Sequence, residues 1–386
     1  MNNNAAAGLE AAGLTPPISR NVRATLSGAL DAVGLATDSA GTTSAADRAL
    51  LGLPEAERVC FVLVDGLGAH NLAARSGHAP TLRSWTHAEP LTTVAPSTTA
   101  AAITAVGTGE APGATAMMSY ALRSPASGRS FSLISWNDPA LDPVSWQRMP
   151  TLFEQLGGAA DACRLIQPAS FVNSGLTLCA LRGAKALVAD SIDERIDAAA
   201  AALRARCRAV YLYWEELDHA GHRHGWTGEQ WTIQLEALDA AMASLARRLP
   251  AGTLIVLTAD HGMVDVGERM DVAEYPELQR DVDLVSGEER LLHLYTQQPG
   301  AVAARWREAL GKRSTVLLRD DAIATGIFGE VHVEARAVMG DVLVIQHGDF
   351  SVMDSRGRDP HRSLMRGVHG SLTAEEMLVP LIIEVV

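Results

Sequence analysis

Three apolar stretches of this chain each lead into an acidic residue, and this pattern constrains the fold more than any other feature. The stretches and their acidic residues are 59–64 (VCFVLV) before Asp65, 208–213 (RAVYLY) before Asp218, and 253–259 (TLIVLTA) before Asp260. A continuous apolar run is typical of a strand covered on both faces, and therefore of a parallel sheet. Ligands of open α/β sheets bind beyond the carboxyl ends of the strands. We therefore expect the three carboxylates to meet at one sheet edge.

A threonine stands where a helix is expected to begin. Residues 95–99 (APSTT) precede the helix-prone stretch 100–106 (AAAITAV), which Gly107-Thr108-Gly109 closes. This pattern places Thr99 at or near a helix N-terminus. Free backbone amides and the positive end of the helix dipole favour an anion there. Thr99 is therefore a candidate nucleophile toward phosphorus.

Histidines accompany the carboxylates. Asp218 and His222 are four residues apart, a spacing that lets two metal-competent side chains share one face of a turn. His261 follows Asp260, and His369 lies in the segment 367–370 (GVHG). Each motif alone also has a structural interpretation, as a turn, a helix cap or a polar loop. Their conjunction at strand and helix ends favours a functional site.

These motifs carry a resemblance to the alkaline phosphatase superfamily, and within it to the type I phosphodiesterase and nucleotide pyrophosphatase branch. The matching segments are 59–66, 96–99, 107–109, 218–222, 258–263 and 367–370. The resemblance implies an alkaline-phosphatase-like fold and two zinc ions, with manganese as the alternative metal. The implied ligands are Asp218, His222 and His369 for one ion, and Asp65, Asp260 and His261 for the other, with Thr99 as nucleophile bridging toward the second ion.

Metal-assisted displacement at phosphorus independently requires such a set of residues. A catalytic zinc keeps three protein ligands and one open position. Two ions about 4 Å apart stabilise both the attacking and the leaving oxygen of an in-line displacement. A threonine hydroxyl is a poor nucleophile at neutral pH, and metal coordination is a route to its alkoxide. We expect hydrolysis of a phosphodiester or phosphoanhydride bond through a phospho-threonine intermediate.

Substrate choice follows less directly from the motifs. Residues 100–102 (AAA) replace the Phe-Pro-Asn-type stretch of the eukaryotic-type nucleotide pyrophosphatases, and Tyr120 stands where those enzymes place a phosphate-contacting Asn. Tyr120 is therefore the candidate substrate-binding residue. Residues 95–120 contain no Lys or Arg, which favours diesters over monoesters. The alternatives are a phosphonate hydrolase resembling phosphonoacetate hydrolase, a phosphomonoesterase with the same site, and a noncatalytic metal-binding protein.

Strand and helix patterns alternate along most of the chain, which predicts an α/β fold with a doubly wound, mostly parallel sheet. The pattern changes from 275 to 352, where we expect a small inserted α+β subdomain. The expected organisation is an N-terminal segment (1–58) that packs on the core, a catalytic α/β core (59–274 and 353–386), and the insertion (275–352).

Composition limits the partners and the compartment. A net charge of −13 argues against binding a nucleic-acid polymer, because such binding relies on clustered Lys and Arg. The expected partner is a small phosphorylated or phosphonate substrate, and the oligomeric state stays open. No apolar run reaches the roughly 18 residues that span a bilayer, and the four cysteines show no paired spacing. With an N-terminus that lacks a basic and apolar leader pattern, these features predict a cytoplasmic protein.

Overall fold

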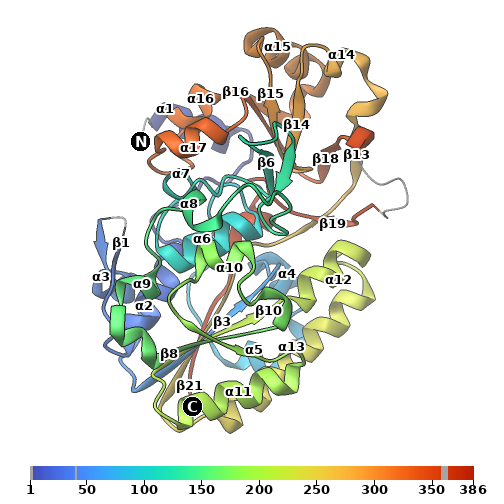
Figure 1. Cartoon of the computed structure of the whole chain (residues 1–386). Coiled ribbons are helices and arrows are strands. Elements are labelled where there is room, and N and C mark those ends of the chain that lie inside the picture. The colour runs from blue at the N-terminus through green and yellow to red at the C-terminus, as the bar shows by residue number, and fades with distance from the viewer. Residues whose placement is uncertain (1–2, 40, 358–363) are drawn as a thin grey trace.

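The computed structural model describes residues 3–39, 41–357 and 364–386. Its main element is a seven-stranded sheet in the lower half of Figure 1. In spatial order the strands are β4 (Thr86–His87), β21 (Leu381–Val385), β11 (Thr253–Ala259), β3 (Arg58–Val64), β10 (Ala209–Trp214), β8 (Cys163–Gln167) and β9 (Lys185–Val188). The five strands from β11 to β9 run parallel, while β21 and β4 are antiparallel to their neighbours. The predicted mostly parallel sheet is confirmed.

The three apolar stretches form the centre of this sheet. Every residue of β10 and β11 is buried, as are all residues of β3 after Arg58. The parallel register aligns the strand ends, with Val64 opposite both Trp214 and Ala259. The chain therefore leaves all three strands at the same edge.

Helices cover both faces of the sheet. The helices α11 (Ile192–Arg204) and α13 (Glu229–Arg248) pack together on one face. The helices α2 (Arg23–Ala32), α6 (Thr99–Thr108) and α10 (Gly175–Ala180) form the layer on the other face, where α6 contacts both of its neighbours. Helix layers on both faces of a mostly parallel sheet are typical of a doubly wound α/β fold. The predicted doubly wound fold is confirmed.

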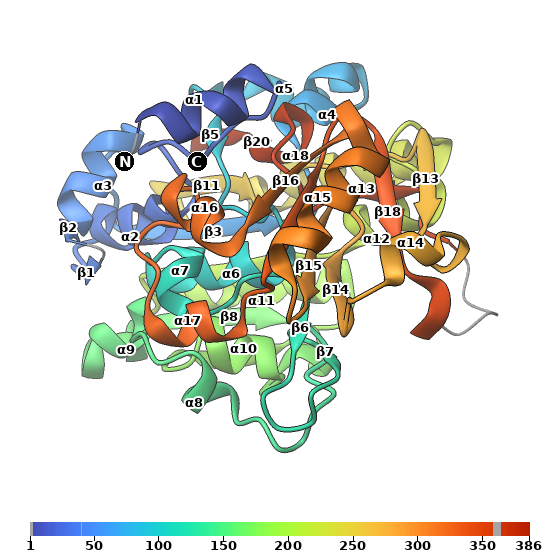
Figure 2. The ribbon, with the colours of Figure 1, turned by 90° about the horizontal axis from the view of Figure 1, so that it is seen from above.

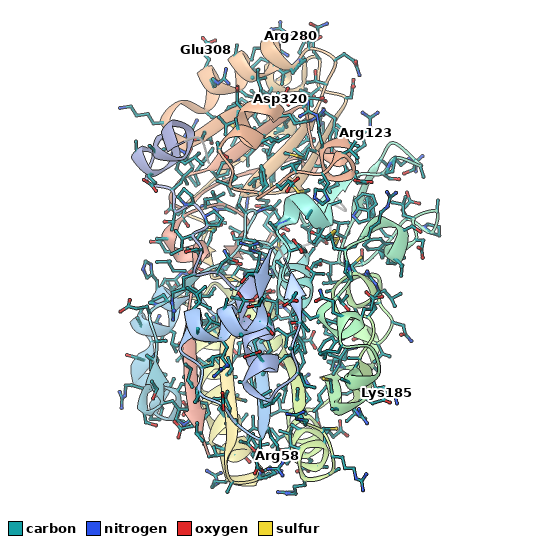
Figure 3. The ribbon with its side chains drawn as sticks, turned by 90° about the vertical axis from the view of Figure 1, so that its left-hand side faces the viewer. Arg58, Arg123, Lys185, Arg280, Glu308 and Asp320 are labelled. Atoms are coloured by element: carbon teal, nitrogen blue, oxygen red, sulfur yellow. The ribbon has the colours of Figure 1, made fainter. Side chains whose placement is uncertain are left out.

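A second, smaller sheet lies in the upper part of Figure 1. Its antiparallel strands are β14 (Leu284–Glu288), β15 (Leu291–Tyr295), β17 (Val342–Gln346) and β16 (Ser314–Leu318). Helix α15 (Pro299–Leu310) packs on it through the buried Trp306. Arg280 and Glu308 mark this end of the molecule and Arg58 the opposite end (Figure 3). The predicted small α+β unit is confirmed.

The segments that join the two sheets run side by side. The strand β13 (Glu268–Asp271) pairs with β18 (Phe350–Met353), and β12 (Val264–Asp265) pairs with β19 (Gly367–Val368). The hairpin of β6 (Ala121–Arg123) and β7 (Ser130–Ser132) contacts β14, as the view from above shows (Figure 2). One apolar cluster includes Met117, Leu291 and Leu372 and is continuous across the junction. The predicted domain boundaries stay a prediction.

The remaining elements are short and lie mainly in connections. The further helices are α1 (Asn3–Ala11), α3 (Ser44–Leu51), α4 (Ala69–Ala74), α5 (Pro80–Ser84), α7 (Pro112–Thr115), α8 (Pro143–Trp146), α9 (Leu152–Gln155), α12 (Glu216–His224), α14 (Pro276–Gln279), α16 (Arg319–Ala324), α17 (Val333–Val338) and α18 (Ala374–Met377). The further strands are β1 (Asp38–Ser39), β2 (Thr42–Thr43), β5 (Leu91–Thr92) and β20 (Leu378–Val379). Within the described ranges, no helix is long and apolar enough to cross a membrane. The cytoplasmic location stays a prediction.

Candidate metal centre and active site

The carboxyl edge of the large sheet carries two of the three predicted carboxylates directly. Asp65 follows β3 and Asp260 follows β11, and both are buried. Gly66 has a positive φ of 75°, and a Cβ atom there would lie 3.1 Å from the Asp218 Cβ atom. Glycine therefore suits this position, since it adopts the left-handed turn and leaves space for the third carboxylate.

Helix α12 presents the third carboxylate and the first histidine. Asp218 and His222 are separated by one turn of this helix, and His222 Nε2 lies 3.2 Å from Asp218 Oδ2. Gly221 lies between them, where a Cβ atom would overlap the sulfur of Met263. The helix can therefore pack closely against the segment that carries Asp260 and His261.

Six of the predicted residues form two groups of three. The groups are Asp218, His222 and His369, and Asp65, Asp260 and His261. Within each group, one candidate ligand atom per residue lies within 4.8 Å of the others. The groups adjoin, because the rings of His261 and His369 stack with their centroids 3.6 Å apart. The structure thus brings together two candidate metal groups, while the role of each residue as a ligand stays a prediction.

Backbone carbonyls orient all three histidines in the same way. The Nδ1 atom lies 2.8 Å from the Gly367 carbonyl oxygen in His222, 3.1 Å from that of Gly262 in His261, and 2.9 Å from that of Ser97 in His369. A ring that donates from Nδ1 can keep the lone pair on Nε2 for a metal. The Nε2 atoms are the ones that face the carboxylates. This arrangement fits the predicted role of the three histidines as metal ligands.

Asp65 and Asp260 each accept hydrogen bonds through one carboxylate oxygen, while the other oxygen lies 3.4 Å from His261 Nε2. Asp260 Oδ1 accepts from the amides of Gly66, at 3.1 Å, and His261, at 2.9 Å. Asp65 Oδ2 accepts from the Tyr213 hydroxyl. Within the described part of the chain, the buried oxygens Oδ1 of Asp65, Oδ1 of Asp218 and Oδ2 of Asp260 have no hydrogen-bond donor. Buried acceptors are normally satisfied. Their gathering beside imidazole nitrogens fits bound cations.

Burial and neighbouring charges shift the pKa values of the residues at the site. Burial, reinforced by the charges of Asp260 and Asp218, raises the pKa of Asp65 well above its usual value. Burial also raises the pKa of Asp260 and lowers that of His369 well below its usual value. Burial opposes protonation of His222, but Asp218 raises its pKa to about 9. Bound divalent cations would displace the proton from His222 and offset the charge of the clustered carboxylates.

Thr99 is the first residue of α6, in agreement with the predicted helix start. Its Oγ1 atom lies 3.0 Å from His261 Nε2, so the hydroxyl adjoins the second group. The preceding Thr98 is the N-cap residue, yet its side chain forms no capping hydrogen bond. The amides of the first turn therefore remain available to an anion. The assignment of Thr99 as nucleophile stays a prediction.

A cavity of about 900 Å³ opens onto these residues. Thr99 lines it together with members of both metal groups. Tyr120, the predicted substrate-binding residue, also lines it, and the insertion contributes the segment 285–289. The segment 285–289 thus forms part of the pocket wall, whereas the role of Tyr120 in binding stays a prediction.

Three supporting residues escaped the sequence analysis. Tyr213 donates to Asp65, Ser97 Oγ contacts the Gly370 amide at 3.1 Å, and Glu376 accepts from the Ser371 amide at 3.0 Å. The last two hold the loop around His369. Because side chains alternate along a strand, the sequence could have indicated which face of β10 carries Tyr213. Glu376 pairs with the buried Arg290, 86 residues away, and no local pattern reveals such a pair.

The sequence matches the family model described as type I phosphodiesterase / nucleotide pyrophosphatase over residues 59–372. The chain belongs to this family. It is a hydrolase-family member with two candidate metal groups, as the resemblance of its motifs predicted. No curated protein matches the chain.

Solved structures of similar fold come from two kinds of protein. Murine ectonucleotide pyrophosphatase/phosphodiesterase 5 superposes with a TM-score of 0.68 and 16% identity, covering 84% of this chain and 87% of that one. Phosphonoacetate hydrolase from Sinorhizobium meliloti, in complex with phosphonoformate, gives 0.68 and 18%, covering 90% and 92%. An inactive Thr-to-Ala variant of the murine protein, in complex with AMP, gives 0.63 and 16%, covering 84% and 87%. These likenesses show the alkaline-phosphatase-like fold of this phosphodiesterase-family chain.

Proposed function

We propose that this chain is a metal-dependent phosphodiesterase that works through a phospho-threonine intermediate at Thr99. The observation that carries the proposal is the position of Thr99 Oγ1, 3.0 Å from His261 Nε2 and at the wall of the cavity onto which both candidate metal groups open. The inactive Thr-to-Ala variant of the murine relative supports a threonine with an essential role.

The donor set fits two divalent transition-metal ions. Asp218, His222 and His369 would hold one, and Asp65, Asp260 and His261 the other. When bound, such ions lower the pKa of a nearby hydroxyl and offset charge on the attacking and leaving oxygens. Nitrogen and carboxylate ligands in threes favour zinc, with manganese as the alternative.

Residues of this chain would supply the nucleophile and bind the phosphate group. The Thr99 hydroxyl loses its proton and Oγ1 forms a bond to phosphorus, while the bond from phosphorus to the departing oxygen breaks and that oxygen takes up a proton to leave as the alcohol. The first-turn amides of α6 would face the phosphoryl oxygens, because the helix dipole favours negative charge at this end. Water then cleaves the threonine ester, which restores the hydroxyl and releases a phosphomonoester.

Charge in the cavity favours a diester. Its described lining contains six acidic residues and no Lys or Arg, the acidic residues being Asp65, Glu215, Asp218, Glu288, Glu289 and Asp354. A diester carries one negative charge at its phosphate, whereas a monoester or a phosphonoacetate carries more. The described lining offers no Lys or Arg side chain that could offset this additional charge.

The deciding experiment compares substrates on metal-loaded protein. Bis(p-nitrophenyl) phosphate, p-nitrophenyl phosphate and phosphonoacetate are assayed after loading with zinc and, separately, with manganese. We expect the diester to be preferred at least tenfold in kcat/KM, which corresponds to about 1.4 kcal/mol of transition-state binding. A preference for the monoester or the phosphonate would favour the alternative activities. Inactivity on all three with two bound ions would favour a noncatalytic metal-binding protein.

A further inference from the structure

Arg290 is a fully buried arginine that the proposed reaction does not use. It lies in the turn between β14 and β15 and directly follows the segment 285–289, which lines the active-site cavity. Its Nη2 atom donates to the Gly348 carbonyl oxygen at 2.6 Å, and Nη1 donates to the carbonyl oxygen of Phe350. The backbone of the insertion therefore holds the guanidinium in place.

The partner of Arg290 lies outside the insertion. Glu376 belongs to helix α18, and its side chain is also fully buried. Arg290 Nε donates to Glu376 Oε1 at 3.0 Å, and Nη2 donates to Oε2 at 2.8 Å. A guanidinium that bonds both oxygens of a carboxylate fixes its orientation as well as its distance. The insertion therefore orients the Glu376 side chain.

Glu376 in turn holds the loop that carries His369. Its Oε1 atom accepts from the Ser371 amide at 3.0 Å, and Oε2 accepts from the Thr373 hydroxyl at 2.5 Å. The Ser371 carbonyl oxygen accepts from the Ser97 hydroxyl at 2.6 Å, and the Ser97 carbonyl oxygen lies 2.9 Å from His369 Nδ1. A short chain of hydrogen bonds therefore leads from the carboxylate to the imidazole.

The hairpin of β14 and β15 also packs against this loop. Gly370, the residue after His369, has a φ of 128°. A Cβ atom there would lie 3.0 Å from the Glu288 Cβ atom and 3.5 Å from the Arg290 Cβ atom. The insertion is therefore in close contact with the loop of His369 as well as bonded to it through Glu376.

The backbone of Glu376 makes a separate contact beside the second metal group. Its carbonyl oxygen accepts from the Gly262 amide at 2.9 Å, and Gly262 follows His261. This bond does not involve the carboxylate. Loss of the carboxylate would therefore release the loop of His369 and leave the tether beside His261 in place.

We infer that Arg290 is a positioning residue, which acts through Glu376 to hold His369 in place for a metal ion. The ion is the one assigned to the group that also contains Asp218 and His222. The inference rests on the proposed function, from which it takes the two metal groups, and deepens it. A buried ion pair is often no more stabilising than apolar residues of similar volume, so stability alone does not account for this pair.

The test measures zinc affinity in the absence of substrate. Zinc-loaded wild type and the double variant Arg290→Met/Glu376→Met are titrated with a chelator of known affinity, and circular dichroism checks that both are folded. The double variant leaves neither charge of the pair buried alone, so it should be more stable than either single variant. We expect one of its two zinc ions to bind about 10–100-fold more weakly, since hydrogen-bond partners behind a ligand have effects of this size. The affinity of the other ion should change less than about threefold.

Two further variants identify the ion and keep the test decisive. In a protein that already carries His369→Ala, the paired substitutions should weaken zinc binding no further, because the residue that they position is absent. Arg290→Lys keeps the charge but loses the fork of donors, so it should weaken the same ion at least about threefold. This single variant answers the question if the double variant does not fold.

The matched control removes another ion pair of the insertion. Arg319 and Asp341 lie 2.6 Å apart and outside the described cavity lining, and Arg319→Met/Asp341→Met should keep the affinity of both ions. Unchanged zinc binding in the folded Arg290 variants, an equal loss of both ions, or an equal effect of the control would overturn the inference and leave the proposed function intact. Wild type that binds no zinc or manganese would overturn the proposed function together with the inference.

Discussion

The two ends of the active-site cavity are built in different ways. At the sheet edge, polar atoms are buried and tethered, since every candidate histidine ligand contacts a backbone carbonyl through Nδ1. The facing walls come from the β6–β7 hairpin, the segment 167–181 and the insertion, and they mix hydroxyls, apolar groups and acids. On the proposed function, the reacting groups would lie at the buried, tethered end, whereas the walls that would select the substrate come from connections.

Removal of metal should have the largest effect on activity, because all the candidate metal ligands lie at the sheet edge. We expect purified protein to hold close to two equivalents of metal, and a chelator to abolish diesterase activity and lower the melting temperature. The reason is that the chelator leaves the buried carboxylates facing one another, and a ligand that binds only the folded state stabilises it. Elemental analysis, activity and thermal melting check this, with zinc added back as the control. Full activity in protein with one equivalent or none would contradict the two-group centre.

Thr99→Ala should come next, with a loss in kcat of roughly 10⁴-fold or more, as for other covalent nucleophiles. Six candidate ligands remain in this variant, so its metal content should stay near that of wild type. Thr99→Ser keeps the hydroxyl and should retain partial activity. Steady-state kinetics and metal analysis on the same samples check both statements. Retention of most activity in Thr99→Ala would move the attack to another group, such as a water molecule.

The sequence was most informative at this same end of the cavity. A strand that is buried on both faces is visible as an apolar run, and the residue that follows it necessarily leaves the sheet at its carboxyl edge. For this reason Asp65 and Asp260 could be placed before the structure, and the spacing of Asp218 and His222 placed both on one face, which proved to be a helical face of α12. The motif resemblance supplied His369, which no strand pattern locates.

The cavity walls were much less predictable, for a physical reason. They are made by contacts between segments that are remote in sequence, such as the 2.6 Å contact between the hydroxyls of Ser130 and Ser286 across the β7–β14 junction. Gln167 is the last residue of its strand, and Asp65 is the first residue after its own strand. An amide after an apolar run, however, does not indicate a particular function in a sequence. Only the structure shows that its Nε2 atom is buried and without a partner.

Tyr213→Phe removes one of the hydrogen bonds that hold the candidate ligands at the sheet edge. Without the hydroxyl, Asp65 loses the hydrogen bond to Oδ2, and we expect affinity for the metal of its group to fall about 10–100-fold. Competition with a chelator of known affinity measures this. Tyr295→Phe is the matched control, because that buried hydroxyl contacts the Val338 carbonyl at 2.7 Å, outside the cavity lining. The control should lose stability but keep metal affinity; equal effects of the two variants on metal affinity would show that the Tyr213 tether is not specific.

Thr98→Ala should have the smallest effect, although Thr98 adjoins the candidate nucleophile. If Thr98 capped α6, alanine would cost about 1 kcal/mol of stability. Its side chain makes no capping bond, and its buried Oγ1 atom has no hydrogen-bond partner among the described residues. Alanine therefore removes an unsatisfied hydroxyl, and we expect a near-zero change in the free energy of unfolding and less than about threefold in kcat/KM. Denaturant titration and kinetics beside Thr99→Ala test the register of the site. A large loss in Thr98→Ala with retention in Thr99→Ala would assign the attack to the neighbouring hydroxyl, because adjacent side chains at a helix start point in different directions.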